Sequence, residues 1–339
     1  MGQMLAARLN VRTHELRMAQ VPVPEPGRGQ VRVQVAAAGV CLSDVHLVDG
    51  TLNPMYLDGE EVTLGHEVAG TIDRLGADVQ GWKVGQRVLL QAGEEDAAGR
   101  VWTRGVDYDG GYAEYCLATQ ETLVAIPDRL PFEQACIIPD AVSTPWAAIT
   151  TSGQIRPAEP VAVWGLGGLG THAVQLLRLI GAAPIVAIDP VPEARERAAQ
   201  LGADATLDPT DSTFTESLFQ VVGPSGLAAA FDFAGVPSVR EQALGVLGSG
   251  GRLVITGLAN QPISIDNDLL FAYQKQSVRG HYGSQPEDVT QLVALTGHDR
   301  LELSQSVSGV FSLQEAPQVI HRLENKEGNP IRLVLTPRR

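Results

Sequence analysis

The hydrophobic and polar positions of the chain follow two different patterns, which change near residue 145. Before that point, short apolar or alternating stretches are separated by Gly and Pro. Examples are VRVQVAAA at 31–38, VAGTIDRLG at 68–76, RVLLQAG at 87–93 and YAEYCLA at 112–118. Many short strands divided by turn residues predict a partly closed antiparallel β-barrel for this part of the chain.

After residue 145, strand-like runs alternate with helix-like runs. VAVWG at 161–165 precedes the apolar-periodic LGTHAVQLLRLIG, and PIVAID at 184–189 precedes PEARERAAQLG. This alternation predicts βαβ units on a parallel sheet. The tail from about residue 284 adds two helix-like stretches and a final strand, IRLVLT. The sequence therefore predicts an α/β protein with two architectures in one chain.

Composition excludes several classes of protein. A chain of 339 residues can bury a large core and is long enough for two domains. Its net charge of −14 argues against a nucleic-acid partner, because binding phosphates needs a cationic surface. No apolar run approaches the ~20 residues that cross a bilayer, and the N-terminal residues lack the apolar region of a signal peptide. Three cysteines are too few for a disulfide framework, so we expect a cytoplasmic protein without a membrane partner.

A glycine-rich turn follows the first strand of the second pattern. Gly165, Gly167 and Gly170 have G-x-G-x-x-G spacing between a strand and a helix, which is the context of a dinucleotide-binding turn. Asp189 ends the next strand, where a carboxylate would accept hydrogen bonds from the adenosine ribose. Because a carboxylate repels a 2′-phosphate, NAD is favoured over NADP.

Two alternatives to an NAD-binding turn are plausible from the residues. Glycine clusters also mark purely structural turns, although the strand, helix and acid around this one favour a nucleotide. Arg195 and Arg197, a few residues after Asp189, could favour a 2′-phosphate, but we expect them to be exposed on the surface of a helix.

A cysteine and a histidine suggest a metal. Cys41 lies in GVCLSDVHLVDG, behind a predicted strand, and His66 and Glu67 follow 25 and 26 residues later. Taken alone, His66 and Glu67 could be an ordinary hydrogen-bonded pair. Cys41, His66 and a third donor together suit catalytic zinc, which takes three protein ligands and leaves one position open.

These motifs resemble those of the zinc-dependent medium-chain alcohol dehydrogenases, and the resemblance covers essentially the whole chain. The matching elements are Cys-x-Ser-Asp at 41–44, GHEVAG at 65–70, GGYAEY at 110–115, GLGGLG at 165–170 with Asp189, and IRLVL at 331–335. The resemblance implies a GroES-like, partly closed β-barrel catalytic domain of residues 1–144 and 284–339. It also implies a Rossmann NAD-binding domain of residues 145–283.

The resemblance further implies the ligand set. Cys41 and His66 match two zinc ligands, and Asp140 matches the third position, where relatives commonly have cysteine and some have aspartate. Cys136, four residues earlier, is the competing candidate, but its apolar surroundings favour a buried core residue. Glu67 matches an occasional fourth ligand that assists exchange.

Three neighbours of Cys41 match a proton path. The resemblance places Ser43 in contact with the alcohol and His46 at the solvent end, where an imidazole titrating near neutral pH is suited to proton transfer. Asp44 would orient His66 through its second ring nitrogen. The alternatives are that Ser43 caps a helix and that His46 is a surface residue.

Further coenzyme contacts are implied by the same resemblance. Thr144 should lie near the nicotinamide, the backbone at Gly257 and Leu258 should line its pocket, and Arg332 should reach the pyrophosphate. Within the glycine-rich turn, Gly168 and Leu169 are also expected to contact the coenzyme.

One segment departs from the family. Many relatives hold a structural zinc with four closely spaced cysteines, but the corresponding stretch, AGEEDAAGRVWTRGVDYDGG at 92–111, has none. We therefore expect one catalytic zinc and no structural zinc, with Trp102 packing in its place. A homodimer or homotetramer is expected, and the shortening of this lobe, which lies near subunit contacts in relatives, leaves the choice between them open.

The sequence thus predicts a zinc-dependent oxidoreductase that transfers hydride reversibly between NAD and an alcohol of secondary or medium size. One alternative is a zinc-free NADPH quinone or enone reductase of the same fold, against which the Cys and His ligands argue. Another is a non-catalytic dinucleotide-binding protein, in which a proton path would be superfluous.

Overall fold

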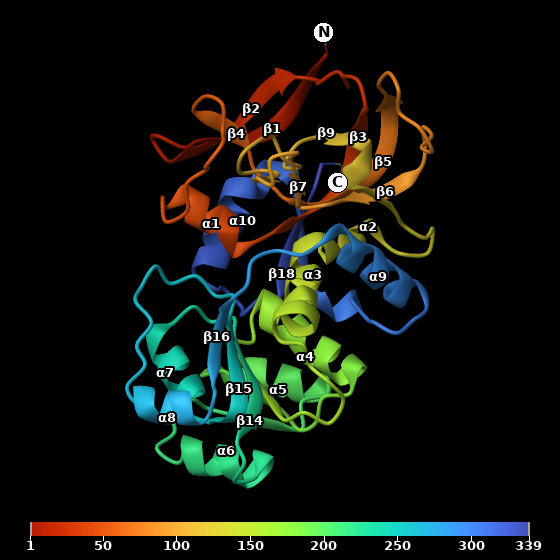
Figure 1. Ribbon diagram of the computed structural model, residues 1–339. Coiled ribbons are helices and arrows are strands. Elements are labelled where there is room, and N and C mark those ends of the chain that lie inside the picture. The colour runs from red at the N-terminus through yellow and green to blue at the C-terminus, as the bar shows by residue number, and fades with distance from the viewer. Residues whose placement is uncertain (1, 338–339) are drawn as a thin grey trace. The chain divides into compact units, whose positions relative to one another are not determined.

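The computed structural model describes residues 2–337 and divides into two compact units (Figure 1). Unit 1 consists of Met1–Ala141 and Gln285–Arg339, and unit 2 consists of Val142–Ser284. Whether the predicted domains 1–144 with 284–339 and 145–283 are separate folding units stays a prediction.

Unit 1 is built mainly of strands in three sheets. A three-stranded sheet has the order β2 (Glu15–Pro22), β1 (Gln3–Asn10), β4 (Glu61–Thr63). A seven-stranded sheet has the order β10 (Leu123–Ala125), β6 (Arg87–Leu90), β5 (Glu67–Leu75), β3 (Gln30–Val40), β18 (Arg332–Thr336), β17 (Val307–Ser312), with β9 (Tyr115–Thr119) also paired to β3. A hairpin joins β7 (Gly93–Glu95) to β8 (Val101–Thr103). The principal helices are α1 (Leu42–Val48), α2 (Phe132–Ala135), α9 (Pro286–Gly297) and α10 (Ala316–Glu324).

The sequence pattern explains the central strand. In β3 the residues VRVQV alternate between buried valines and half-buried polar side chains, as expected for a strand with one face on a core. β3 pairs antiparallel with β5, β9 and β18, whereas β17 and β18 pair parallel, which the antiparallel prediction did not include. Ile320 and Leu323 of α10 share one apolar core with β3, so the C-terminal segment belongs to unit 1.

Unit 2 is a six-stranded parallel sheet with helices between the strands (Figure 1). Its order is β13 (Ala205–Leu207), β12 (Ile185–Ile188), β11 (Val161–Trp164), β14 (Leu227–Asp232), β15 (Leu247–Ile255), β16 (Ser277–Gly280). The helices are α3 (Ser143–Ala147), α4 (Gly168–Ile180), α5 (Pro192–Gln200), α6 (Phe214–Val222), α7 (Pro237–Gly245) and α8 (Asp268–Tyr273). Two single turns of π-helix flank α3, at Ile138–Val142 and Ala148–Ser152.

The continuous apolar runs of this region determine that arrangement. VAVW of β11 and IVAI of β12 are buried at every position, which is typical of parallel strands covered on both faces. The strand order reverses direction beside β11. Doubly wound sheets bind ligands at the carboxyl ends of the strands beside such a reversal. The prediction of a two-domain α/β fold with a barrel-type part and a Rossmann-type part is confirmed.

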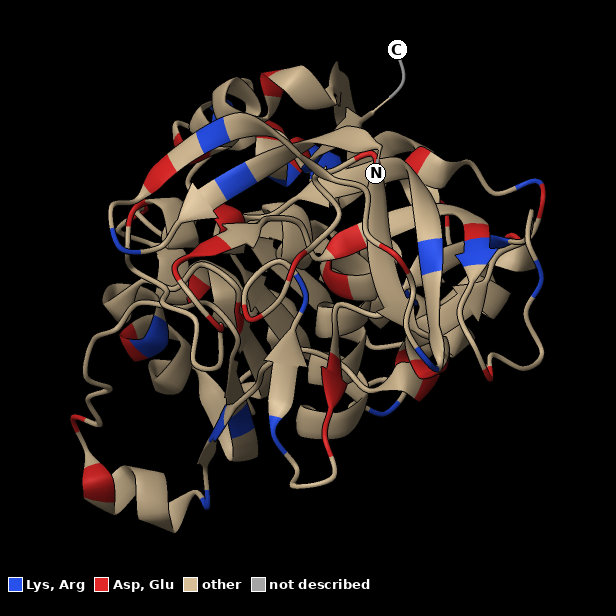
Figure 2. Ribbon diagram, turned by 90° about the horizontal axis from the view of Figure 1, so that it is seen from above, with Lys and Arg blue, Asp and Glu red and all other residues tan. Residues whose placement is uncertain are grey.

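The distribution of charged residues and the character of the helices bear on the expectations drawn from composition. Acidic and basic residues are intermixed along the ribbon in Figure 2 and do not gather in a basic stripe in the part of the chain that the structure describes. Among residues 2–337, none of the helices combines the length and the apolar character that a membrane span requires.

In the lobe that lacks cysteines, an aromatic side chain packs against a neighbouring ring. The Trp102 ring lies 4.9 Å from the Tyr56 ring, centroid to centroid, and its Nε1 donates to Asp96 Oδ2 at 3.1 Å. Arg100 completes the cluster by an ion pair with Asp96 at 2.7 Å. These hydrogen bonds from the backbone of Arg100 and from Trp102 keep the pKa of Asp96 well below its ordinary value. Trp102 therefore packs within this lobe as expected, and that its packing holds the lobe stays a prediction.

We expect Trp102→Ala to lower the free energy of unfolding by about 1–3 kcal/mol, since a half-buried aromatic side chain and its ring contact are lost together. Urea denaturation measures the change, and a double-mutant cycle with Tyr56→Ala isolates a ring coupling of about 0.5–1.5 kcal/mol. Additive effects of the two substitutions would show that the rings do not stabilise each other.

Candidate metal centre and dinucleotide site

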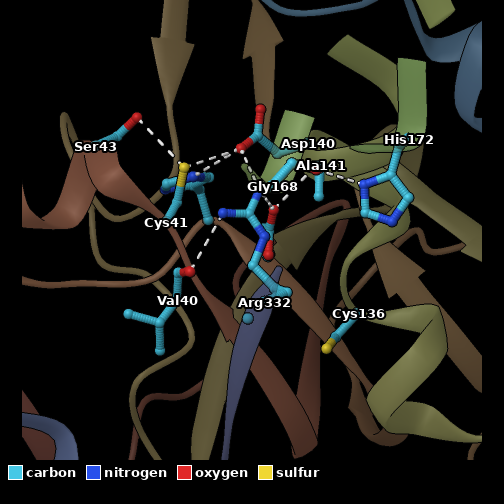
Figure 3. A network of polar contacts seen from close by, with 12 residues as sticks. Val40, Cys41, Ser43, Cys136, Asp140, Ala141, Gly168, His172 and Arg332 are labelled. Atoms are coloured by element: carbon cyan, nitrogen blue, oxygen red, sulfur yellow. Dashed lines mark hydrogen bonds and ion pairs between the residues drawn. The ribbon is translucent and has the colours of Figure 1, made fainter. Parts of the chain in front are cut away.

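Three side chains predicted to bind metal meet in unit 1. Cys41 caps the start of α1, His66 lies just before β5, and Asp140 lies in the π-helical turn Ile138–Val142. Asp140 Oδ2 is 3.2 Å from Cys41 Sγ and 3.5 Å from His66 Nε2, and the three ligand atoms lie within 4.8 Å of one another. Figure 3 shows Cys41 and Asp140 turned toward each other.

The donor set fits zinc. A thiolate, an imidazole and a carboxylate are all zinc donors. Ligands in a tetrahedron about 2.0–2.3 Å from one ion lie roughly 3.3–3.8 Å apart, close to the two distances given above. Cys41 and His66 are buried, while the Asp140 side chain is 18% exposed, so the cluster has one accessible side. Among the described residues this is the one group of three His, Cys, Asp or Glu with metal-binding spacing.

The outer ring nitrogen of His66 faces a carboxylate. His66 Nδ1 is 3.8 Å from Asp44 Oδ1, and both buried atoms lack another hydrogen-bond partner. Asp44 Oδ2 is fixed by the Cys41 N–H at 2.9 Å and the Tyr112 hydroxyl at 2.7 Å. Burial alone would lower the pKa of His66, but the hydrogen bond to Asp140 and the charge of Asp44 raise it well above its ordinary value. A metal ion binding here must therefore displace a proton from His66.

Glu67 is buried beside the cluster with a cation as its partner. Arg332 Nη2 lies 2.9 Å from Glu67 Oε1 and 3.6 Å from Asp140 Oδ2. The Ala141 N–H also donates to Glu67 Oε1 at 2.9 Å. Burial raises the pKa of Glu67 to about 8, although Arg332 acts in the opposite direction. The carboxylate is thus held by Arg332 and the backbone, and a direct bond from Glu67 to the metal stays a prediction.

Gly39 makes room for this carboxylate. A Cβ atom at Gly39 would lie 1.9 Å from Glu67 Oε2, so any other residue would displace the buried side chain. Arg332 Nη1 also donates to the Val40 carbonyl at 3.3 Å. The contact of Arg332 with Glu67 was not foreseen from the sequence, and its contact with the coenzyme pyrophosphate stays a prediction.

Cys136 is separate from the cluster. It is fully buried, its Sγ lies 3.4 Å from the Glu133 carbonyl, and burial raises the pKa of its thiol well above the ordinary value. Figure 3 shows its sulfur apart from Cys41 and Asp140. The metal-binding group therefore contains Asp140 rather than the nearby cysteine.

The proposed proton path begins close to the sulfur. Ser43 Oγ is 3.7 Å from Cys41 Sγ, and Ser43 is half-buried in the first turn of α1. The residue that caps this helix is Cys41, so the alternative that Ser43 caps a helix is wrong. The His46 side chain is 29% exposed, with Nδ1 3.7 Å from Asp49 Oδ2. His46 is therefore neither buried nor fully exposed, as the outer end of a path to solvent requires.

The glycine-rich turn of unit 2 needs glycine for two different reasons. Gly165 has φ +86°, a left-handed conformation that side chains disfavour. A Cβ at Gly170 would lie 1.8 Å from the Gly165 carbonyl, so only glycine allows α4 to approach the turn. A Cβ at Gly167 would meet nothing within 4 Å, which leaves open space beside its backbone at the start of α4. Gly168 and Leu169 form the first turn of that helix, whose N–H groups favour an anion.

Asp189 links this turn to the end of β12. Its Oδ2 accepts from the Leu166 N–H at 2.7 Å, and its Oδ1 accepts from the Val191 N–H at 2.9 Å.

The prediction that Arg195 and Arg197 are exposed is wrong. Both side chains fold back: Arg195 donates to the Asp189 carbonyl at 2.6 Å, and Arg197 donates to the Leu166 carbonyl at 2.9 Å. Burial lowers the pKa of Arg197.

The predicted nicotinamide contacts lie in unit 2. Gly257 and Leu258 follow β15 at the carboxyl end of the sheet. Thr144 is buried, and its carbonyl lies 3.0 Å from Nε2 of His281, the residue after β16. His281 Nδ1 is 3.0 Å from Ser152 Oγ. Thr144 is thereby held at the same edge as the ends of the strands.

The sequence interpretation missed several of these residues. Tyr112 lies within the GGYAEY motif already noted. The sequence did not show that the Tyr112 hydroxyl would contact Asp44. Asp232 ends a buried strand as Asp189 does, and this strand-end acid could have been noticed by the same rule. His281 follows an edge strand and gave no local signal.

Comparison with known proteins identifies the family. The Alcohol dehydrogenase GroES-like domain matches residues 27–128, and the Zinc-binding dehydrogenase domain matches residues 168–297. An alcohol dehydrogenase of Geobacillus stearothermophilus is 34% identical over 265 residues, covering 74% of this chain and 76% of the relative. The chain belongs to the zinc-binding medium-chain dehydrogenase/reductase family.

Two further relatives match over most of their length. An NAD-dependent alcohol dehydrogenase of Sulfurisphaera tokodaii is 28% identical over 328 residues, covering 91% of this chain and 93% of the relative. A protein of Sinorhizobium meliloti 1021, described as a zinc-binding dehydrogenase and solved with NADP, has a TM-score of 0.90 at 26% identity, covering 99% and 100% of the two chains. The predicted family and enzyme class, an oxidoreductase, are confirmed, and the cluster of Cys41, His66 and Asp140 is consistent with a single catalytic zinc.

Proposed function

We propose that this protein is an NAD-dependent alcohol dehydrogenase that interconverts a secondary or medium-sized alcohol and its carbonyl compound. The convergence of Cys41, His66 and Asp140 within 4.8 Å is the observation that carries the proposal. A structural or sensing protein has no use for such a three-donor cluster with one accessible side. The zinc-free reductase alternative has no explanation for it.

Cys41, His66 and Asp140 would hold the zinc. When bound, zinc supplies a Lewis acid that increases the acidity of a bound alcohol. Asp44 keeps the His66 ring in one orientation, and Tyr112 keeps Asp44 in place. Arg332 pairs with buried Glu67 at 2.9 Å, so the two side chains hold each other in place beside the ligands.

Ser43 and His46 would conduct the alcohol proton away. Ser43 Oγ, 3.7 Å from Cys41 Sγ, is placed to accept a hydrogen bond from an alcohol at the cluster. The imidazole of His46 is partly exposed and can pass a proton to solvent. The chain's contribution is thus to orient the alcohol and to give its proton a route.

The glycine-rich turn and Asp189 would bind the coenzyme, which supplies the hydride acceptor. The open backbone at Gly167 and the start of α4 suit the pyrophosphate. The Asp189 carboxylate suits an unphosphorylated ribose and therefore NAD. Thr144, Gly257 and Leu258 would surround the nicotinamide.

An absorbance assay at the NADH wavelength tests the proposal. Purified protein with one equivalent of zinc should oxidise members of a panel of primary, secondary and cyclic alcohols with NAD, and more slowly with NADP. Binding of NADH without turnover of any alcohol or carbonyl compound would support the non-catalytic alternative instead.

Asp189→Ser should raise the KM for NAD roughly 10–100-fold, the loss of a charged hydrogen bond worth about 1.5–3 kcal/mol. The KM for NADP should change less or fall, because the repulsion of the 2′-phosphate disappears. Asp204→Asn is the matched control, since Asp204 accepts from the Ile185 N–H at the other end of β12. Equal changes for both coenzymes would contradict the role given to Asp189.

The protein is also proposed to be a cytoplasmic homodimer or homotetramer. β16 is an edge strand with one side unpaired in the sheet, and edge strands invite pairing with a second copy. Helix α8, which precedes β16 in the chain, buries none of its residues, and Leu269 and Tyr273 are 78% and 82% exposed.

Light scattering should give a mass of at least two chains for the wild type and one chain for Leu269→Glu/Tyr273→Glu. A monomeric wild type would contradict this proposal.

A further inference from the structure

A fully buried ion pair lies in unit 2 at the carboxyl end of the parallel sheet. Asp232, the last residue of β14, is 0% exposed, and the Arg240 side chain of α7 is 6% exposed. Arg240 Nε lies 3.0 Å from Asp232 Oδ2. Removing two charges from water is costly, so such a pair persists where further hydrogen bonds use its remaining atoms. Asp232 Oδ1 and Arg240 Nη2 contact the backbone of two loops.

The first loop follows β14. Asp232 Oδ1 accepts from the N–H groups of Ala234 and Gly235, both at 2.9 Å. Gly235 has φ +66°, so the chain turns sharply there. The carboxylate therefore fixes this turn on one side and Arg240 on the other.

The second loop follows β15 and contains Gly257. The Gly257 N–H donates to the Asp232 carbonyl at 2.8 Å, and the Gly257 carbonyl accepts from Arg240 Nη2 at 2.9 Å. The Arg240 side chain thus binds the Gly257 carbonyl, and the backbone of Asp232 binds the Gly257 N–H. A Cβ at Gly257 would lie 2.2 Å from the Gly235 N, so the two loops touch through their backbones.

Little else in unit 2 restrains this second loop. Leu258 is 55% exposed, and every residue from 260 to 270 is exposed. The position of the Gly257–Leu258 backbone therefore depends on its contacts with Asp232, Arg240 and Gly235. Ligands of doubly wound sheets bind at this edge, and a misplacement of about 1 Å can cost roughly 100-fold in rate.

We infer that Asp232 and Arg240 are positioning residues that set the backbone of Gly257 and Leu258 against the nicotinamide half of the coenzyme. The inference rests on the proposed function, because that function is what places a nicotinamide at this edge. Neither side chain needs to touch the coenzyme. The Arg240 side chain acts through the Gly257 carbonyl, and the Asp232 side chain acts through Arg240 and through the turn that follows β14.

The test compares Arg240→Met with Arg252→Met. Arg252 is a matched control: its side chain is 12% exposed, it pairs with Glu159 at 2.7 Å, and it also donates to backbone carbonyls of unit 2. Dissociation constants are measured for NADH by fluorescence and for ADP-ribose by calorimetry. ADP-ribose lacks the nicotinamide and depends on the glycine-rich turn and Asp189 alone.

Arg240→Met should weaken NADH binding roughly 10–100-fold and leave ADP-ribose binding within about twofold. Arg252→Met should change neither dissociation constant by more than about twofold, even if it lowers the melting temperature as much as Arg240→Met does. Arg240→Lys keeps the charge but has one ammonium for two acceptors, so we expect a loss of about 3–10-fold, and this variant decides the matter if Arg240→Met does not fold.

Equal weakening of NADH and ADP-ribose, or equal effects of the Arg240 and Arg252 variants, would show a merely structural role and overturn the inference. A wild-type protein that binds neither ligand would overturn the proposed function itself, together with the inference. The two failures are therefore distinguishable by the wild-type titration.

Discussion

Asp140→Ala should release the zinc, while Cys136→Ser should retain it. Asp140 Oδ2 lies 3.2 Å from Cys41 Sγ and 3.5 Å from His66 Nε2, so the substitution removes one of three ligands. Changes to residues one step further from a metal already cost about 10–100-fold in affinity, so we expect a larger loss here. Activity should fall by roughly 1,000-fold, because several kcal/mol of transition-state stabilisation depend on the metal.

Metal content after dialysis against a weak chelator measures this effect without any assay of activity. Cys136→Ser is the matched control, since Cys136 is the competing candidate ligand four residues away and is fully buried. It should keep one equivalent of zinc and show only the modest loss of stability of a core substitution. Zinc retained by Asp140→Ala and lost by Cys136→Ser would mean that the ligand assignment is wrong.

Arg332→Met should lower the free energy of unfolding by about 3–5 kcal/mol, the cost of breaking a buried pair by removing one partner. Arg332 Nη2 lies 2.9 Å from Glu67 Oε1, and the two side chains are 4% and 0% exposed. Without the guanidinium, Glu67 is left buried without its cationic partner, next to Asp140. Urea denaturation of the zinc-free protein measures the effect separately from metal binding.

The double variant Glu67→Gln/Arg332→Met should recover a substantial part of this loss, because the glutamine can still accept from the Ala141 N–H without carrying a charge. Glu67→Gln alone should be less costly than Arg332→Met, since it leaves the cation with Asp140 at 3.6 Å. Strictly additive effects in this cycle would show that the two side chains do not stabilise each other.

Local sequence was sufficient to predict the sheet of unit 2 and its nucleotide turn. Runs such as VAVW and IVAI are apolar at every position because both faces of a parallel strand are covered. Gly165 and Gly170 occur where backbone conformation and helix approach exclude a side chain, so their spacing could be interpreted without coordinates. The same holds for Asp189 at the end of the next strand.

Partners from distant segments could not be predicted in this way. The resemblance assigns Arg332 to the coenzyme pyrophosphate and gives no sign of its partner Glu67, which is 265 positions away. Arg195 and Arg197 look like exposed helix residues, but carbonyls at the strand ends draw both side chains inward. The choice of such contacts depends on how strands far apart in the chain are brought together, which no local pattern encodes.

The sequence by itself determined the class of fold, the kind of coenzyme turn and the residue types that could hold a metal, because hydrophobic periodicity, glycine spacing and donor chemistry are local properties. Only the tertiary structure showed how closely Asp140 approaches Cys41 and His66, that Arg332 pairs with Glu67, and that Arg240 holds the Gly257 carbonyl. Those contacts depend on distances of about 3 Å between segments separated along the chain, and the packing of β-strands and helices sets such distances.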